Sequence, residues 1–515
     1  MKNTLMRSSL WHALPLLAGL LVGPATGWAQ GPSTTVQGSG ELPVALIQAW
    51  QKTGLPLSSL SVWVQDVNEP RPLLSVAADQ SRRMASVMKL ITTGMALRTL
   101  GPAHTWTTPV ALGGTIDRQG VLHGPLFIRA SGDPSMDATR LREALQAWRE
   151  AGLQEIRGDL VVDKSLWRLP PHDPGAFDGE PLKAYNAGPD PWLIAHGAIT
   201  LRWRIDGGAP GQPLVTASPG LHSLVLDNQV QLAPQGPCGD WRAGIAQTVI
   251  TTPEGVRTWR LQGRYPVACG TQHWPLRWPA QDALEHSARV WAATWASLGG
   301  AMTGVVREGP WPAQATPWAS WSSPPLAEVV RDINKFSNNV MARHLFLTLG
   351  QPPKSNLATD ADATTTSLPD ALIQARTVVT GHVQAATRQA DGSRPCEVEG
   401  ALLMDNGSGL SRTEGASARC MGRWVQVMWQ DPVMPEWLAS LPVAGLDGTA
   451  RRMTAATGRA HLKTGSLDDV VSVAGIVQGW SGRRYAMVAV VNDPQAERAR
   501  GALQALLQWV TEDTP

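Results

Sequence analysis

Three short motifs in a fixed order, with one long gap between the first two, constrain this chain most. Ser86-Val87-Met88-Lys89 is an S-x-x-K motif, Ser337-Asn338-Asn339 is an S-x-N motif, and Lys463-Thr464-Gly465 is a K-T-G motif. Ser337 lies 248 positions after Lys89. If the motifs act together, the fold must bring distant segments to one place.

Each motif alone is weak evidence, and K-T-G occurs a second time at Lys52-Thr53-Gly54. The structural context of the three motifs is more specific. S-x-x-K begins a predicted helix over 85–100, which stops at Gly101, and S-x-N interrupts a helical pattern over 326–349. K-T-G at position 463 leads into a predicted hairpin of strands 470–477 and 484–491.

The chemistry of serine acylation explains the first motif. A serine hydroxyl is a poor nucleophile without a base beside it. Ser86 and Lys89 share one face of a helix because they are three positions apart. A neutral Lys89 amine can take the serine proton if its pKa falls well below about 10.4. Burial and a second cation, which Lys463 would supply, lower that pKa.

The other two motifs add groups that bind substrate or move protons. Ser337 is expected to relay a proton to the leaving amine, and Asn339 to hold a substrate amide. Lys463 and Thr464 offer a cation and a hydroxyl to a substrate carboxylate. After Gly465, the N–H of Ser466 and the N–H of Ser86 are expected to form an oxyanion hole.

The first 29 residues have the pattern of a secretory signal peptide. Lys2 and Arg7 precede an apolar stretch at 14–22, and Gly27-Trp28-Ala29 resembles a cleavage site. The apolar stretch is short for a membrane span, and no later segment is a candidate span. We therefore expect an exported, periplasmic, soluble protein.

The charge balance disfavours two classes of main partner. The chain has 44 basic and 42 acidic residues, and two of the basic ones lie in the leader. The rest of the chain is formally neutral, which argues against nucleic acid or an anionic membrane as the main partner. No clustered His and Cys spacing predicts a metal site, and no cofactor is expected.

The four cysteines fit an oxidising compartment, where an even number suggests disulfides. Three pairings are possible. Neighbouring pairs, Cys238–Cys269 and Cys396–Cys420, are the simplest choice, and four free thiols are the alternative.

After the leader, the sequence near both ends of the chain predicts several strands. Runs at 60–68 and 72–79 predict a hairpin, and the runs at 459–463, 470–477 and 484–491 predict further strands. One antiparallel sheet can be built from both ends. Between about 105 and 280, short strands alternate with Gly and Pro, which predicts a mostly β region of one or two inserted domains.

The motifs and several further blocks resemble the class C low-molecular-mass penicillin-binding proteins, which are D-alanyl-D-alanine carboxypeptidases and endopeptidases. The trio of S-x-x-K, S-x-N and K-T-G is typical of penicillin-binding proteins and β-lactamases. The resemblance covers about 42–492. Similar blocks are Ser131-Gly132-Asp133-Pro134, 158–163, Tyr185-Asn186-Ala187, 405–412, 441–445 and Asp447-Gly448-Thr449.

The resemblance implies an α+β fold of the penicillin-binding/β-lactamase-like transpeptidase type, an antiparallel sheet packed by helices with large inserted domains. On this basis we expect a D,D-peptidase domain made of 30–93 and 285–515. The inserted residues are then 94–284, with a nested subdomain at about 195–270. The chain departs from the family pattern at Met84, where proline is common, and at 194–197, where an Asn-rich stretch is common.

The resemblance also implies an activity: cleavage of peptidoglycan stem peptides through an acyl-enzyme on Ser86, with β-lactams as covalent inhibitors. Lys89 then resembles the general base, Ser337 and Asn339 the second catalytic element, and Lys463, Thr464 and Gly465 the element that recognises a carboxylate. Two alternatives stay open: a β-lactamase, or an inactive cell-wall-binding protein on the same fold. An α/β-hydrolase esterase is disfavoured because no G-x-S-x-G occurs.

Overall fold

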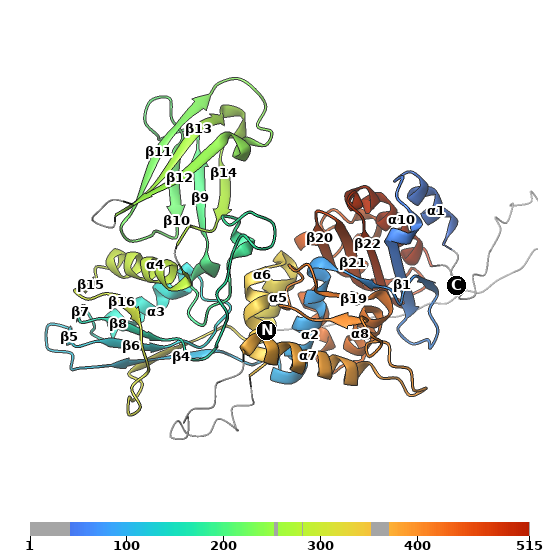
Figure 1. Cartoon of the computed structure of the whole chain (residues 1–515), viewed down its shortest axis with the longest axis horizontal. Helices are drawn as coiled ribbons and strands as arrows, with labels where there is room; N and C mark the ends of the chain where they lie inside the picture. The colour runs from blue at the N-terminus through green and yellow to red at the C-terminus, as the bar shows by residue number, and fades with distance from the viewer. Residues whose placement is uncertain (1–41, 252–255, 281, 352–369, 514–515) are drawn as a thin grey trace, which may run out of the picture. The chain divides into compact units, whose positions relative to one another are not determined.

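A computed structural model describes residues 42–251, 256–280, 282–351 and 370–513. The predicted leader lies outside these residues. A five-stranded antiparallel sheet joins the two ends of this part of the chain, as Figure 1 shows. This confirms the predicted sheet. Its order is β2 (Leu74–Val76), β1 (Leu60–Asp66), β22 (Arg484–Asn492), β21 (Val470–Gln478) and β20 (Ala460–Leu467).

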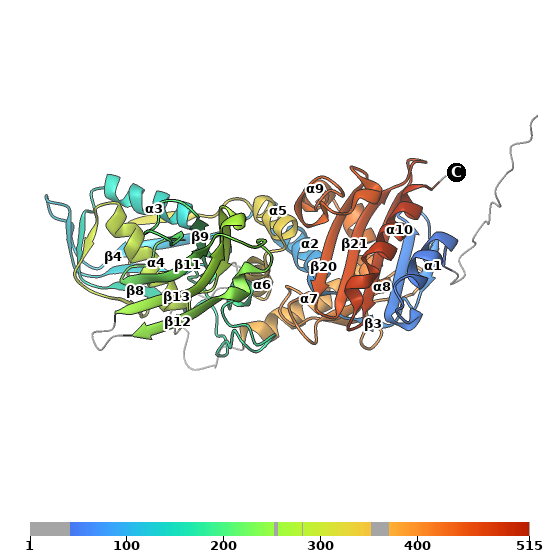
Figure 2. The same cartoon turned by 90° about the horizontal axis from the view of Figure 1, so that it is seen from above.

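Side chains alternate between the two faces of this sheet, and each face is covered by helices. Val473 and Val491 pack on one face with α1 (Val44–Gln51) and α10 (Arg500–Thr511). Ala474 and Val490 pack on the other face with a larger set of helices (Figure 2). That set consists of α2 (Lys89–Leu100), α5 (Leu326–Phe336), α6 (Asn339–Leu349), α7 (Ala371–Thr387), α8 (Ala418–Gln430) and α9 (Met434–Ser440).

The two helical patterns that carry motifs form as predicted, with one refinement. The segment expected as a helix from residue 85 begins as a 3-10 turn, η2 (Ala85–Met88), and becomes α-helical at Lys89. The break near Ser337 separates α5 from α6. Ser337 itself has φ +57°, a left-handed conformation that ends α5 and lets α6 start in a new direction.

Between α2 and α5 lies an α/β module rather than an all-β one. One sheet has the order β16 (Val306–Glu308), β8 (Leu160–Asp163), β6 (Leu126–Arg129), β4 (Thr107–Leu112) and β17 (Ala319–Ser322), and a smaller one has β15 (Ala301–Met302), β7 (Glu155–Arg157) and β5 (Val121–His123). Several of these pairs are parallel. Two helices, α3 (Ala138–Glu150) and α4 (Ala283–Ser297), pack in the same core.

The prediction of a mostly β insertion therefore overlooked α3. The helical signal is present in the sequence, because Leu141, Leu145 and Trp148 recur at helical spacing and are all buried. Asp137 caps the helix by accepting a hydrogen bond from the Arg140 N–H. The frequent Gly and Pro residues on either side obscured this pattern.

The strand pairing also bears on the limits of the insertion, which were expected at 94 and 284. Helix α2 continues past 94 to Leu100, and position 284 falls inside α4. The later strands β16 and β17 pair with β8 and β4. We therefore propose that the inserted region runs from about Gly101 to about Ser322.

Within that region, two three-stranded sheets are built from 199–276. They are β10 (Leu214–Ser218), β9 (Ile199–Arg204) and β14 (Gln272–Leu276), and β11 (Leu224–Ala233), β13 (Arg257–Pro266) and β12 (Ile245–Thr251). Buried aromatic rings fill the space between them: Trp203 stacks on Tyr265 at 5.2 Å and meets Trp241 edge-on at 5.3 Å. The chain has 23 Trp residues, and several of them thus belong to an ordinary hydrophobic core.

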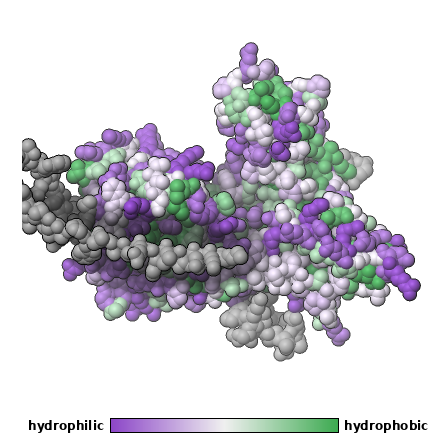
Figure 3. Space-filling view, turned by 180° about the vertical axis from the view of Figure 1, so that it is seen from behind, coloured by the Kyte–Doolittle hydropathy of each residue, from purple (hydrophilic) through white to green (hydrophobic). Residues whose placement is uncertain are grey.

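Both predicted disulfides, Cys238–Cys269 and Cys396–Cys420, are formed. Among the described residues, no helix combines the length and the apolar character that a bilayer crossing requires. On the face seen in Figure 3, hydrophilic residues are interspersed with smaller apolar groups.

Candidate active site

The K-T-G strand lies directly against the segment that carries Ser86. A Cβ on Gly465 would lie 2.5 Å from the Met84 carbonyl oxygen and 3.0 Å from the Ala85 Cβ, so only glycine allows this approach. Ser472 on the neighbouring strand fixes the same segment by donating a hydrogen bond to the Met84 carbonyl at 2.7 Å. The first and third motifs are therefore adjacent.

Lys89 is the centre of the hydrogen-bond network. Its Nζ lies 2.9 Å from Ser86 Oγ and 2.6 Å from Asn339 Oδ1, and it also contacts the Ser408 carbonyl oxygen. The side chain is fully buried. Burial, and then the charge of Lys463, lowers the pKa of Lys89 well below its usual value.

The lowered pKa of Lys89 favours its neutral amine, and the three partners of the amine can accommodate that form. A neutral amine has two N–H groups and one lone pair. The carbonyl oxygens of Asn339 and Ser408 can only accept hydrogen bonds, so they use the two N–H groups. The lone pair is then left for the hydroxyl proton of Ser86. This arrangement allows Lys89 to accept the proton of the Ser86 hydroxyl.

Lys463 forms a second buried pair with the second motif. Its Nζ donates to Ser337 Oγ and to the Thr464 carbonyl, both at 2.9 Å. Burial lowers the pKa of Lys463 to about 7. The left-handed turn at Ser337 directs that side chain to Lys463, while Asn339, two residues on, reaches Lys89. Asn338 between them caps α6 by accepting from the Met341 N–H.

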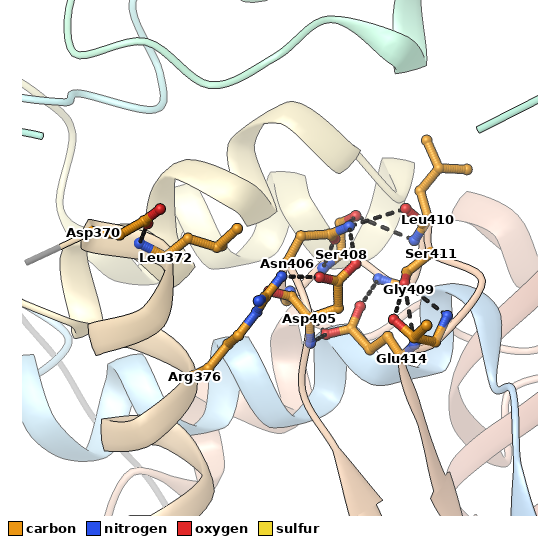
Figure 4. A network of polar contacts seen from close by, with 12 residues as sticks. Asp370, Leu372, Arg376, Asp405, Asn406, Ser408, Gly409, Leu410, Ser411 and Glu414 are labelled. Carbon is orange, nitrogen blue, oxygen red and sulfur yellow. Dashed lines mark hydrogen bonds and ion pairs between the residues drawn. The ribbon is translucent and has the colours of Figure 1, made fainter. Parts of the chain in front are cut away.

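A loop over 405–414 completes the site. Its Ser408 carbonyl contacts Lys89, and its Gly407 carbonyl accepts from Thr92 Oγ1 at 2.6 Å. Figure 4 shows the carboxylate of Glu414 pointing into the loop. It accepts backbone N–H groups from Asp405, Gly407 and Gly409 at 3.2, 2.8 and 2.6 Å.

Glu414 is fully buried, and burial raises the pKa of its carboxyl group. At the edge of the loop, Arg376 pairs with Asp405, whose backbone carbonyl also accepts from Arg376 Nε at 2.8 Å. The signal available in the sequence was a Gly-rich block followed by a single Glu. Ser408 contacts Lys89 through its backbone carbonyl, so the type of residue at this position does not reveal the contact.

Arg343 on α6 is a further buried cation that sequence reasoning missed. It donates to the Ala187 carbonyl at 2.9 Å and so ties α6 to the Tyr185-Asn186-Ala187 block. Burial lowers the pKa of Arg343 to about 10. Its charge also contributes to the lowered pKa of Lys89.

Thr464 and Ser466 lie at the open side of β20, which is an edge strand. Thr464 donates to Thr449 Oγ1 at 2.8 Å, and Ser466 Oγ accepts from Arg500 at 2.9 Å. All eight residues predicted for the site thus lie on η2, α2, the α5–α6 turn, the first residue of α6 or β20. The pairing of the Ser86 and Ser466 N–H groups as an oxyanion hole stays a prediction.

Comparisons with known proteins agree with this geometry. The model of the D-Ala-D-Ala carboxypeptidase 3 (S13) family matches residues 44–383 and 396–513. A D-alanyl-D-alanine carboxypeptidase from Actinomadura sp. (strain R39) is 28% identical, over 97% of this chain and 89% of the relative. The crystal structure of penicillin binding protein 4 from Haemophilus influenzae has a similar fold, with a TM-score of 0.68 and 20% identity over 90% of this chain and 98% of that one.

Proposed function

The chain belongs to the D-Ala-D-Ala carboxypeptidase 3 (S13) family and is a serine-type carboxypeptidase/endopeptidase, and on this premise we propose which residues carry the reaction. Ser86 is the nucleophile, Lys89 its general base, and Ser337, Asn339 and Lys463 the remaining catalytic groups. Thr464, Gly465 and Ser466 bind substrate. The substrates are peptidoglycan stem peptides ending in D-Ala-D-Ala, or cross-links at the same position.

In acylation, Ser86 Oγ attacks the carbonyl carbon of the penultimate D-Ala and its proton passes to the neutral amine of Lys89. The new C–O bond forms as the C–N bond to the terminal residue breaks. The leaving nitrogen takes a proton through Ser337, which lies 2.9 Å from the Lys463 amine. Water then attacks the ester and passes its proton through Ser337 to the Lys463 amine. Lys89 returns its proton to Ser86, and the shortened peptide leaves.

One observation carries this proposal. The Lys89 amine is fully buried, lies between two carbonyl oxygens that can only accept, and faces the Ser86 hydroxyl at 2.9 Å. A solvated surface lysine has no reason to be placed in this way, because burying an ammonium group is costly unless its environment compensates.

The test is to incubate the protein with labelled penicillin, digest it and locate the label. We expect an adduct on the peptide that contains Ser86, and no adduct in Ser86→Ala. Ser58→Ala, a surface serine in η1 (Leu57–Ser59), serves as the matched control and should label like the wild type. Labelling that survives in Ser86→Ala would disprove the assignment.

Covalent inhibition by β-lactams is part of the proposal. It is supported by the structure of H. influenzae penicillin binding protein 4 in complex with a β-lactam, which shares the fold at a TM-score of 0.65. Class A β-lactamases use a Glu with an Asn four residues later, and no Asn in this chain has a Glu four positions before it. Rapid, repeated hydrolysis of a chromogenic cephalosporin would favour the β-lactamase alternative instead, and binding of muropeptides without turnover would favour an inactive binding protein.

We further infer export to the periplasm. The leader pattern and the two disulfides support it, because disulfides persist in oxidising compartments. Fractionation of cells that express the full chain, with and without residues 2–29, tests this inference.

A further inference from the structure

The residue that follows the K-T-G motif is held by an arginine from the last helix. Arg500 is the first residue of α10, and its Nη2 lies 2.9 Å from Ser466 Oγ. The same guanidinium is fixed by Glu497, which accepts from Nη2 at 2.7 Å and from Nε. Arg500 therefore reaches β20 in one defined orientation.

The direction of this hydrogen bond follows from the groups involved. A guanidinium can only donate, so Ser466 Oγ must be the acceptor. The hydroxyl keeps its own proton, which points away from Arg500. Thr464 differs, because its hydroxyl donates to Thr449 Oγ1. Ser466 is thus the hydroxyl on this edge that is set to donate to an incoming acceptor.

The position of Ser466 identifies that acceptor. Residues two apart on a strand point to the same face, so Ser466 and Thr464 share one side of β20 and Lys463 and Gly465 the other. Gly465 is buried against the segment of Ser86 and Lys463 is buried beside Ser337, whereas Ser466 is exposed. A substrate laid along the edge of β20, with its scissile carbonyl at Ser86, brings the carboxylate of its last residue past the scissile bond to the Thr464 and Ser466 hydroxyls.

We propose that Arg500 is a positioning residue that acts through Ser466 to select substrates with a free α-carboxylate on the leaving group. The inference rests on the proposed function and adds a residue to it. Because Glu497 pairs with the guanidinium of Arg500 and fixes it, the effect is directional: Arg500 orients the Ser466 proton toward the carboxylate.

The experiment compares two peptides that both end in D-Ala-D-Ala, one with a free carboxylate and one with a C-terminal amide. In Arg500→Ala, we expect KM for the free peptide to rise about tenfold, the value for one charge-assisted hydrogen bond. We expect kcat to change less than twofold and the slow turnover of the amide to be unaltered. Arg500→Lys should restore part of the selectivity, and Ser466→Ala should match Arg500→Ala without adding to it in the double variant.

Arg498→Ala is the matched control, because Arg498 is an exposed arginine two residues earlier. It should leave both peptides unaffected. Equal loss on the two peptides in Arg500→Ala would mean that Arg500 only anchors α10, and no loss on either would also overturn the proposal. If Arg500→Ala does not fold, Arg500→Met, which keeps most of the aliphatic side chain but cannot donate to Ser466, gives the readout in its place. A wild-type protein without turnover or penicillin adduct would instead refute the proposed function.

Discussion

The Lys89 amine lies 2.6 Å from the side-chain oxygen of Asn339, although 250 positions separate the two residues in sequence. The first two motifs are therefore in contact although the whole insertion lies between them in sequence. A change at Asn339 should therefore change the pKa of Lys89, because that pKa depends on the few groups that surround the buried amine.

Replacing Asn339 by Asp should shift the pH dependence of acylation. A carboxylate at this distance favours the charged amine and raises the pKa of Lys89 by about 1–3 units. Because acylation requires the neutral amine, the acid limb of the rate profile should move to higher pH, and the rate at pH 7 should fall at least about tenfold. Stopped-flow penicillin acylation between pH 5 and 10 measures this shift.

The control for that variant is Asn338→Asp. Asn338 caps α6, a position where Asp serves equally well, and it makes no hydrogen bond to Lys89. Its profile should overlay that of the wild type. An unshifted profile in Asn339→Asp would show that Lys89 is not the titrating base.

Lys463→Met should abolish activity yet stabilise the fold in a pH-dependent way. With a folded pKa of about 7 and an unfolded value of about 10.4, the unfolded chain binds a proton that the folded chain releases between these pH values. Stability of the wild type therefore rises with pH across this window, and a penalty of roughly 4–5 kcal/mol is fully present below pH 7. Removing the lysine should raise the melting temperature most at pH 6–7 and little near pH 10.

Lys52→Met, in the second K-T-G of the sequence, is the comparison. Lys52 is exposed at the end of α1, so this change should alter neither activity nor the pH dependence of melting. A gain in Lys463→Met that is constant with pH would contradict the explanation by buried charge.

Gly409→Ala should remove penicillin binding. A Cβ at this position would lie 1.8 Å from the Ala85 carbonyl oxygen, next to the nucleophile, and Gly409 also has φ +77°. Gly54→Ala separates the two effects, since Gly54 has φ +69° with nothing within 4 Å. It should cost about 1–2 kcal/mol of backbone strain but leave acylation intact. Thermal melts and labelled penicillin distinguish the two variants, and normal labelling of Gly409→Ala would refute the contact.

The two disulfides should differ in their effect on activity. Each closes a loop of similar length, with separations of 31 and 24 residues, so each should contribute about 3.5 kcal/mol. Cys396 and Cys420 lie in the core that surrounds Met88 and Phe346, whereas Cys269 lies in the core of the insertion. On mild heating, the variant with Cys396 and Cys420 both changed to Ser should lose penicillin binding at a lower temperature than the variant with Cys238 and Cys269 both changed to Ser. Loss of penicillin binding at a lower temperature in the variant that lacks Cys238–Cys269 would contradict this order.

The chemistry of the site side chains was predictable from the sequence, and so were the helices and strands with a clear hydrophobic pattern. Ser86, Lys89 and Lys463 have reactive groups in a recognisable order, and the hairpin of β21 and β22 is a nearly continuous apolar run. Helix α3 was overlooked because Gly and Pro residues, which are typical of loops, precede and follow it in sequence. The limits of the insertion depend on which strand β17 joins, and strand pairing between distant segments is not encoded in any local pattern.

Contacts made by the backbone or by docking of distant elements escaped prediction. The Ser408 carbonyl is indistinguishable in sequence from any other carbonyl, and its place depends on Glu414 folding the loop beneath Lys89. Arg500 reaches Ser466 only because α10 packs against β21. Such contacts follow from tertiary packing, which a motif search does not see.

The sheet that joins both ends of the described chain imposes an order on biogenesis. Strand β1 has β2 and β22 as its neighbours, and β22 is synthesised near the end of the chain. The strands of the insertion find their partners between Thr107 and Ser322, long before that. Because distant pairing slows folding, the inserted modules should assemble first on a nascent or translocating chain. Ser86 then meets the K-T-G strand only when almost the entire polypeptide has emerged, which keeps the hydrolase inactive until its synthesis is nearly complete.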